Sequence, residues 1–113
     1  MRLPNADRAI IEESKLRDYL LSPEHPIGRH KARVFRRLGY SQTLWQKLEA
    51  DLRAQHATQD AEPGERSPYG QKFEIRAILT GPSGSSAEII SVWIIMAGEE
   101  VPRFVTAMPG GQT

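Results

Sequence analysis

The apolar residues of this chain change their spacing once, and that change limits the fold more than any other feature does. Before residue 56 they recur at every third or fourth position, as on one face of a helix. After residue 70 they alternate with other residues, as in strands with one buried face. Helices followed by consecutive strands with short turns predict an α+β fold. We expect about three N-terminal helices packed on one face of a three- or four-stranded antiparallel sheet.

The boundaries of these parts follow from the residues that interrupt the patterns. The helical part spans residues 12–56 and is divided by Pro23 and Gly39, neither of which continues a helix. Residues 57–70 are polar, contain Pro and Gly and have no period, so they are predicted to form a flexible surface loop. The sheet part spans residues 71–109. We expect a single domain over residues 1–113, because this length suits one core.

The composition excludes several kinds of site. The chain has no cysteine, so it cannot form disulfides or zinc sites with cysteine ligands, and it fits a reducing compartment. Its three histidines show no HxH or HxxxH spacing that would hold a metal. The longest apolar run, Ile89–Met96, is too short to cross a bilayer. We therefore expect a cytoplasmic protein with no metal, no cofactor and no membrane partner.

A basic segment stands out from the mixed charges of the rest. Residues 25–48 hold six of the chain's 15 Lys and Arg residues and none of its 14 acidic residues. On a helix, four arginines fall opposite the apolar side chains of Val34, Phe35 and Leu38. These binding candidates are Arg29, Arg33, Arg36 and Arg37. Such a face favours an anionic partner, which is either RNA or another polyanion, or an acidic protein encoded beside this one.

Two residues of the same helix do not fit this division. Lys31 lies near the middle of the apolar face, and His30 lies at its edge. In one interpretation, Lys31 extends its charge past the end of the core into solvent. In the other, Gly28 allows a ligand to approach the free N–H groups of the first turn, and Lys31 completes a phosphate-sized anion pocket in which His30 exchanges a proton.

The strands offer a second group of candidates. The alternation assigns Glu74, Arg76 and Trp93, together with Ser91, to the sheet face that the helices leave open. This face is either a solvated surface with one exposed aromatic residue or a platform for chemistry. On a platform, Arg76 would hold a phosphate, Glu74 would transfer a proton and Trp93 would stack a base. Thr106, on the last strand, would join them.

Four stretches of the chain are distinctive: KLRDYLL (15–21), HPIGRHKARVF (25–35), LGY (38–40) and PRFVTAMP (102–109). On these stretches the chain resembles a family of small bacterial domains that is catalogued as uncharacterised, and the resemblance covers nearly the whole chain. Such domains occur as short free-standing proteins and at the ends of larger secreted proteins. The resemblance implies no particular activity.

The order of helices first and antiparallel sheet second is similar to that of bacterial ribonuclease toxins built like barnase and RelE. In those toxins the open face of the sheet holds the site, and a late strand often ends in Thr-x-Tyr-Pro. Here the strand ends in Thr106-Ala107-Met108-Pro109, so the tyrosine is missing and the role of that position is in doubt. The resemblance implies a ribonuclease, although a shared layout does not by itself give a function.

Two functions from different classes follow. The first is a metal-independent endoribonuclease of toxin type, in which a ribose 2′-hydroxyl attacks the adjacent phosphate. His30 would act as base or acid, and Lys31 and Arg76 would stabilise the phosphate. Glu74 or Thr106 would complete the set. The second is a non-catalytic module that binds nucleic acid or an acidic protein through the basic helix. Convergence of His30 and Lys31 with Arg76 would favour the enzyme, and separation would favour the module.

Overall fold

The structure of the protein, a computed structural model, describes residues 1–110. The first half of the chain is helical, and every helical element except η1 lies within the predicted helical part, residues 12–56. Its elements are η1 (Ala6–Arg8), α1 (Glu13–Lys15), η2 (Leu16–Leu20), α2 (Arg29–Arg37), η3 (Gln42–Leu44), α3 (Trp45–Asp51) and η4 (Leu52–His56). The turns η2 and η4 have π-helical geometry and directly continue α1 and α3, so the chain forms three helical units.

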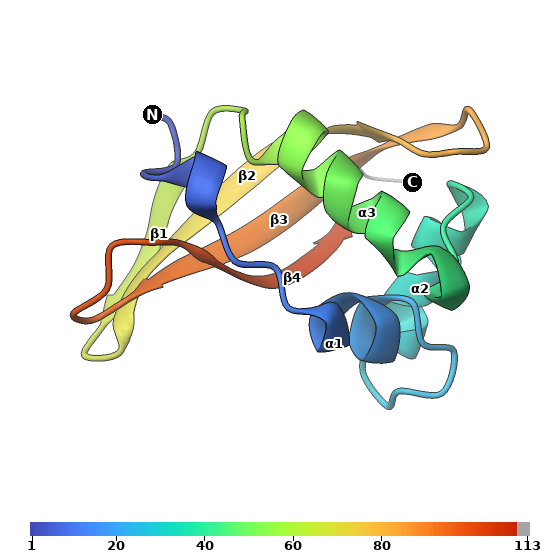
Figure 1. The fold of residues 1–113 in the computed structure, drawn as a ribbon, viewed down its shortest axis with the longest axis horizontal. Coiled ribbons are helices and arrows are strands. Elements are labelled where there is room, and N and C mark those ends of the chain that lie inside the picture. The colour runs from blue at the N-terminus through green and yellow to red at the C-terminus, as the bar shows by residue number, and fades with distance from the viewer. Residues whose placement is uncertain (111–113) are drawn as a thin grey trace.

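The second half forms one antiparallel sheet with the strand order β1-β2-β3-β4. The strands are β1 (Glu62–Ser67), β2 (Gly70–Thr80), β3 (Ser86–Met96) and β4 (Arg103–Pro109). In Figure 1, α3 crosses in front of the sheet, while α1 and α2 lie together at one end of it, where they contact β4. The predicted α+β class, with three helices before a four-stranded antiparallel sheet, is confirmed.

The segment 57–70 differs from its prediction as a loop. Residues Glu62–Ser67 form β1, which pairs with β2 at the edge of the sheet. The register shifts between Pro63 and Arg66, as in a bulge, and proline is tolerated at such an edge. This strand is held by backbone pairing to a neighbour in a hairpin and buries almost no side chain. The sequence of this strand therefore has no alternation of apolar residues from which a strand could be predicted.

The covered face of the sheet also differs from its prediction. Phe73 pairs with Trp93, and Ile75 pairs with Ser91, so all four side chains share a face. That face is the core, because Ile75, Ser91 and Trp93 are fully buried. The prediction that Ser91 and Trp93 lie on the open face is wrong, and Trp93 cannot stack a base there. The reason is that β3 is apolar on both faces, so alternation alone does not choose between them.

A polar cluster lies inside this core. The ring of His56, at the end of η4, has Nδ1 2.7 Å from the Ser91 Oγ and Nε2 3.1 Å from the Ala77 carbonyl oxygen. Trp93 Nε1 donates to the same Ser91 Oγ at 2.9 Å. Because a carbonyl only accepts, Nε2 carries the proton and the Ser91 hydroxyl donates to Nδ1. Burial lowers the pKa of His56 and keeps it neutral. We name His56, Ser91 and Trp93 the core histidine cluster.

Candidate functional site

Three polar side chains from distant parts of the sequence meet beside β4. The Lys31 Nζ donates to the Tyr19 hydroxyl at 2.5 Å and to the Thr106 Oγ1 at 3.0 Å. The two hydroxyls also lie within hydrogen-bond distance of each other, at 3.0 Å. We name Tyr19, Lys31 and Thr106 the lysine triangle. It joins two residues that the sequence nominated, Lys31 and Thr106, to one that it did not.

Local features of η2 and α2 bring Tyr19 and Lys31 together. Tyr19 lies on η2, which is anchored because Leu16 and Leu20 are fully buried. Lys31 lies in the first turn of α2, and Gly28 is the residue that directly precedes this helix. Gly28 packs so closely on η2 that a Cβ at this position would overlap the backbone carbonyl of Tyr19. The glycine therefore serves the close approach of two helical segments, and not the approach of a ligand that one of the two interpretations of this turn supposed.

The triangle holds a positive charge that no acid within residues 1–110 neutralises. Lys31 is half-buried, and within residues 1–110 its ammonium makes no ion pair with a carboxylate. Other lysines do make such pairs, which are Lys47 with Asp51 and Lys72 with Glu65. A partly desolvated cation that contacts only hydroxyls keeps much of its capacity to attract an anion.

The ammonium also changes the acidity of its neighbour. Burial on its own would raise the pKa of the Tyr19 phenol. The hydrogen bonds from Lys31 and Thr106, together with the charge of Lys31, outweigh burial, and the pKa of Tyr19 is lowered. The phenol therefore gives up its proton more readily than an ordinary tyrosine does.

A histidine adjoins the triangle, but it is not the one nominated from the sequence. The His25 ring packs edge-on against the Tyr19 ring, with centroids 5.0 Å apart and planes at 83°. The backbone N–H groups of Ile27 and Gly28 donate to His25 Nδ1 at 3.1 Å and 3.0 Å. Since Nδ1 accepts these bonds, the ring proton belongs on Nε2. His25 thus fixes the turn before α2 and presents a defined tautomer beside Tyr19.

Strand pairing places a carboxylate in the same row as the triangle. Glu74 pairs with Val92, and Val92 pairs with Thr106, so the three residues share one face of the sheet. Two strand spacings, roughly 10 Å, separate the backbones of Glu74 and Thr106. Glu74 is exposed, whereas Val92 is buried and forms an apolar floor between the two polar groups.

Arg76 lies in the next row of the same face, opposite Ile90. Its Nη1 donates to the Glu88 Oε1 at 3.0 Å and to the Gly110 carbonyl oxygen at 2.8 Å. The side chain is exposed, so these bonds are open to exchange with solvent or with a ligand. Arg76 is therefore near the row of Glu74 but already has partners of its own.

The basic face of α2 forms a separate feature, which we name the arginine hollow. It has a volume of about 390 Å3 and is lined by Pro23, Arg29, His30, Arg33 and Arg36. All of these side chains are exposed. Arg37 is also exposed but does not line the hollow. His30 thus lies with the arginines, and Lys31, the next residue, lies with the triangle.

The structure therefore divides the catalytic candidates named from the sequence among three places. Lys31 and Thr106 are in contact, Glu74 and Arg76 lie on the sheet face beside them, and His30 lies in the arginine hollow. Sequence reasoning missed Tyr19 and His25. For Tyr19 a signal existed, because a tyrosine on the buried side of a helical segment needs a partner for its hydroxyl. For His25 there was none, since its role depends on the turn that it caps.

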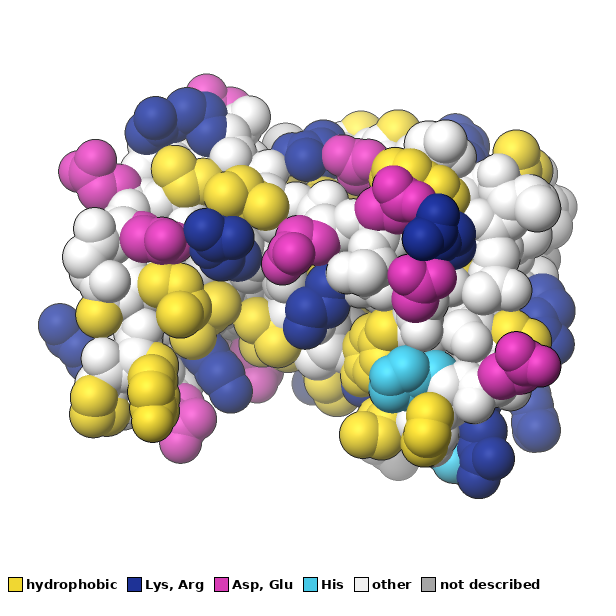
Figure 2. All heavy atoms as spheres, turned by 60° about the horizontal axis from the view of Figure 1, so that its bottom comes forward, with side chains coloured by type: hydrophobic (Ala, Val, Ile, Leu, Met, Phe, Trp, Pro, Cys, Tyr) yellow, Lys and Arg dark blue, Asp and Glu magenta, His cyan; other side chains and the backbone are white. Residues whose placement is uncertain are grey.

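Figure 2 views the molecule from the side that carries β4 and α1. Acidic and basic side chains are interleaved over most of this face, and hydrophobic side chains gather along its lower rim, on both sides of an indentation. This face is therefore mixed in charge, whereas the charged side chains that line the arginine hollow are all arginines.

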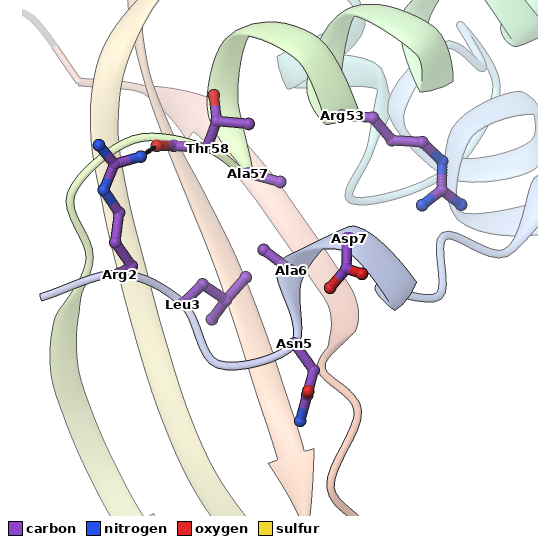
Figure 3. Close-up of a pocket in the computed structure, with 8 residues that line it drawn as sticks. All are labelled: Arg2, Leu3, Asn5, Ala6, Asp7, Arg53, Ala57 and Thr58. Carbon is purple, nitrogen blue, oxygen red and sulfur yellow. Dashed lines mark hydrogen bonds between the residues drawn. The ribbon is translucent and has the colours of Figure 1, made fainter.

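Another hollow differs from the arginine hollow because its lining is mostly apolar. It has a volume of about 410 Å3 and lies between Leu3 and Ala6 of the N-terminal segment and Ala57 after η4 (Figure 3). The arginines at its rim are engaged, since Arg2 donates to the Thr58 carbonyl and Arg53 donates to the Ala9 carbonyl at 2.7 Å. This hollow is mostly apolar, and among residues 1–110 the one carboxylate in its lining is that of Asp7.

Two further features of residues 1–110 concern metals and membranes. No group of three or more His, Asp or Glu side chains in this range is placed to hold a metal ion. None of the helices in the same range combines the length and the apolar character that crossing a membrane requires.

Comparison with known proteins places the chain in a family. The profile of the family described as "Domain of unknown function (DUF6883)" matches residues 2–111, so the chain belongs to this family. A comparison with curated proteins gives no significant match. One similar solved structure is a chain of a contact-dependent growth inhibition toxin–immunity protein complex from Klebsiella pneumoniae 342. It has 17% sequence identity and a TM-score of 0.59, covering 89% of this chain and 99% of that chain, which indicates a shared fold.

Proposed function

We propose that this chain is an endoribonuclease of toxin type that cleaves RNA without a metal ion. The observation that carries the proposal is the lysine triangle, in which a half-buried ammonium without a carboxylate partner contacts a phenol of lowered pKa. Cleavage by a ribose 2′-hydroxyl needs a cation for the phosphate, an acid for the leaving oxygen and a base for the attacking hydroxyl. The triangle supplies the first two.

In the proposed reaction the scissile phosphate lies over Val92, between Glu74 and the triangle. The Glu74 carboxylate takes the proton of the 2′-hydroxyl, and the 2′-oxygen forms a bond to phosphorus. The bond between phosphorus and the 5′-oxygen breaks, and the Tyr19 phenol gives its proton to that oxygen. Lys31 and Thr106 stabilise the charge on the non-bridging oxygens. The products carry a 2′,3′-cyclic phosphate and a 5′-hydroxyl.

The histidines take different parts in this proposal from those expected. His25, which packs on Tyr19, is the histidine of the site and holds the phenol in position. After cleavage the phenolate takes a proton from water, and the Glu74 carboxyl releases one to water. His30 binds substrate within the arginine hollow. Arg76 exchanges its contact with Glu88 for a neighbouring phosphate, because an exposed ion pair is weak.

Two likenesses support this assignment. The fold is similar to that of a chain from a toxin–immunity protein complex. The last strand also resembles the Thr-x-Tyr-Pro ending of ribonuclease toxins, with Met108 in place of the tyrosine. Tyr19 supplies a phenol beside Thr106 from a different element, at 3.0 Å. In this proposal the Tyr19 phenol takes the place of the tyrosine that is missing from the strand ending.

The test is cleavage of several RNAs by the purified chain in the presence of a metal chelator. We expect products with 2′,3′-cyclic phosphate ends. Tyr19→Phe and Lys31→Met should keep the fold, measured by circular dichroism, and lower kcat about 100-fold or more. Lys72→Met, which removes an exposed lysine paired with Glu65, is the matched control and should cleave like the wild type. Equal cleavage by all four proteins, or none by any, would exclude the proposal.

A second candidate function is a non-catalytic module that binds nucleic acid or a co-encoded acidic protein. Two observations favour it. The basic face of α2 needs no catalytic geometry to attract a polyanion. His30 also lies apart from Lys31 and Arg76, which is the separation expected of a module. Absence of cleavage together with salt-sensitive binding of RNA or of an acidic protein would support this module instead of the enzyme.

A further inference from the structure

The arginines of α2 differ from most other arginines of the molecule. Within residues 1–110, Arg29, Arg33, Arg36 and Arg37 form no side-chain hydrogen bond or ion pair. Four arginines elsewhere pair with carboxylates, and these are Arg17 with Glu13, Arg53 with Glu49, Arg76 with Glu88 and Arg103 with Glu99. The chain therefore neutralises its arginines in most places and leaves them unneutralised on α2.

This arrangement has a cost for the free protein. Arg29 and Arg33 are spaced at i and i+4, and Arg33 and Arg36 at i and i+3, so their charges are neighbours on the helix surface. Like charges at these spacings destabilise a helix. No acidic residue lines the hollow to relieve the repulsion. A bound anion would relieve it.

The shape of the hollow selects the kind of anion. It is a concave site of about 390 Å3 lined by three guanidinium groups and one imidazole. A guanidinium donates two parallel hydrogen bonds that match the oxygens of a phosphate. A hollow with several such groups converging fits a compact phosphate, whereas a folded acidic protein would meet it with a broad surface.

We propose that the arginine hollow binds a backbone phosphate of the RNA, a few nucleotides from the phosphate that is cleaved. The inference rests on the proposed function and deepens it by assigning a substrate subsite. Along the α2 axis, Arg33 and Arg36 lie roughly 3–8 Å beyond Lys31, at about 1.5 Å per residue, and they project from the opposite side of a helix about 10–12 Å across. An RNA strand that reaches both sites must therefore pass around α2, and a few nucleotides are needed to do so.

The experiment measures binding of a 2′-O-methyl RNA oligonucleotide, which lacks the attacking hydroxyl, by fluorescence anisotropy. Arg33→Ala and Arg36→Ala should each weaken binding about tenfold and lower the slope of log K against log salt by about 0.7. Arg37→Ala is the matched control, because it removes the same charge from the same helix outside the hollow. It should change Kd by less than about threefold. With cleavable RNA, Arg36→Ala should raise KM and leave kcat unchanged.

The outcomes separate this inference from the proposed function. Equal weakening by Arg36→Ala and Arg37→Ala would overturn the subsite, because attraction would then be a general property of the helix. Polyglutamate binding with the same affinity and the same dependence on Arg36 would overturn it in favour of an acidic protein partner. Loss of binding in Arg36→Ala without any cleavage by the wild type would support the phosphate site and reject the enzyme. Cleavage by the wild type, with unchanged binding and KM in Arg33→Ala and Arg36→Ala, would support the enzyme and reject the phosphate site.

Discussion

The core histidine cluster and the lysine triangle each join a basic side chain to hydroxyl groups. The basic group is neutral and fully bonded in the cluster, and it is charged in the triangle. In the core histidine cluster, His56 and Ser91 are fully buried, and each polar atom has a partner that suits a neutral imidazole. In the lysine triangle, a half-buried cation bonds to two hydroxyls and, among residues 1–110, pairs with no acid. A closed network contributes to stability and offers nothing to a ligand. An open one leaves charge available. The comparison indicates that stability and function reside in different polar clusters of this small domain.

The largest expected effect is a loss of stability when His56 is replaced. His56→Ala would leave a cavity and strand the Ala77 carbonyl without its donor, so we expect a loss of about 3–5 kcal/mol in the free energy of unfolding. Denaturant unfolding measures it. Because such a loss could unfold the domain, Ser91→Ala provides a milder test with a loss of about 1–3 kcal/mol. His30→Ala, at an exposed position, should change stability by less than about 0.5 kcal/mol. A stable, unchanged His56→Ala protein would contradict the assignment.

The lysine triangle should respond in the opposite sense. Lys31→Met removes a charge that gains little from its site, so stability should change by less than about 1 kcal/mol. Cleavage should fall about 100-fold, equivalent to about 2.7 kcal/mol in the transition state. Thermal unfolding and RNA cleavage on the same preparation measure both. A large loss of stability in Lys31→Met would make the triangle a structural cluster like that of His56, and the contrast between the two would disappear.

The same contrast explains which parts were predictable from sequence. The change of apolar period gave the helices and the sheet, because each buries one face. It could not orient β3, where Ile90 and Val92 are as apolar as the buried Ile89 and Trp93. The triangle was half visible: Lys31 stood out as a charge on an apolar face, but its contact with Tyr19 and Thr106 depends on how η2, α2 and β4 pack. No local pattern encodes such a contact.

The two clusters should also differ in their dependence on pH. Burial lowers the pKa of His56 in the folded protein, whereas in the unfolded chain it titrates at about 6.5. Below about pH 6.5 the unfolded state binds a proton that the folded state refuses, so stability falls as pH falls. The slope from this one proton is at most about 1.4 kcal/mol per pH unit. Denaturant unfolding between about pH 5 and 7 measures it, with His30→Ala as the control that keeps the slope. A wild-type protein whose stability is flat over this window would contradict the buried neutral histidine.

The smallest expected effect is a shift in the pH at which the Tyr19 phenol of the lysine triangle ionises. The chain has three tyrosines. The pKa of Tyr19 is lowered by its bonds to Lys31 and Thr106 in spite of burial, and the pKa of Tyr40 is raised by burial and by the adjacent Asp51. Ultraviolet difference absorbance should therefore show that Tyr19→Phe removes a tyrosinate that forms early, while Tyr40 ionises late or only on unfolding. Lys31→Met should move the same signal to higher pH, because burial then acts without the opposing ammonium. If Tyr19→Phe instead removes the last tyrosine to ionise, the phenol is not activated, and Tyr19 is not the acid in the proposed cleavage.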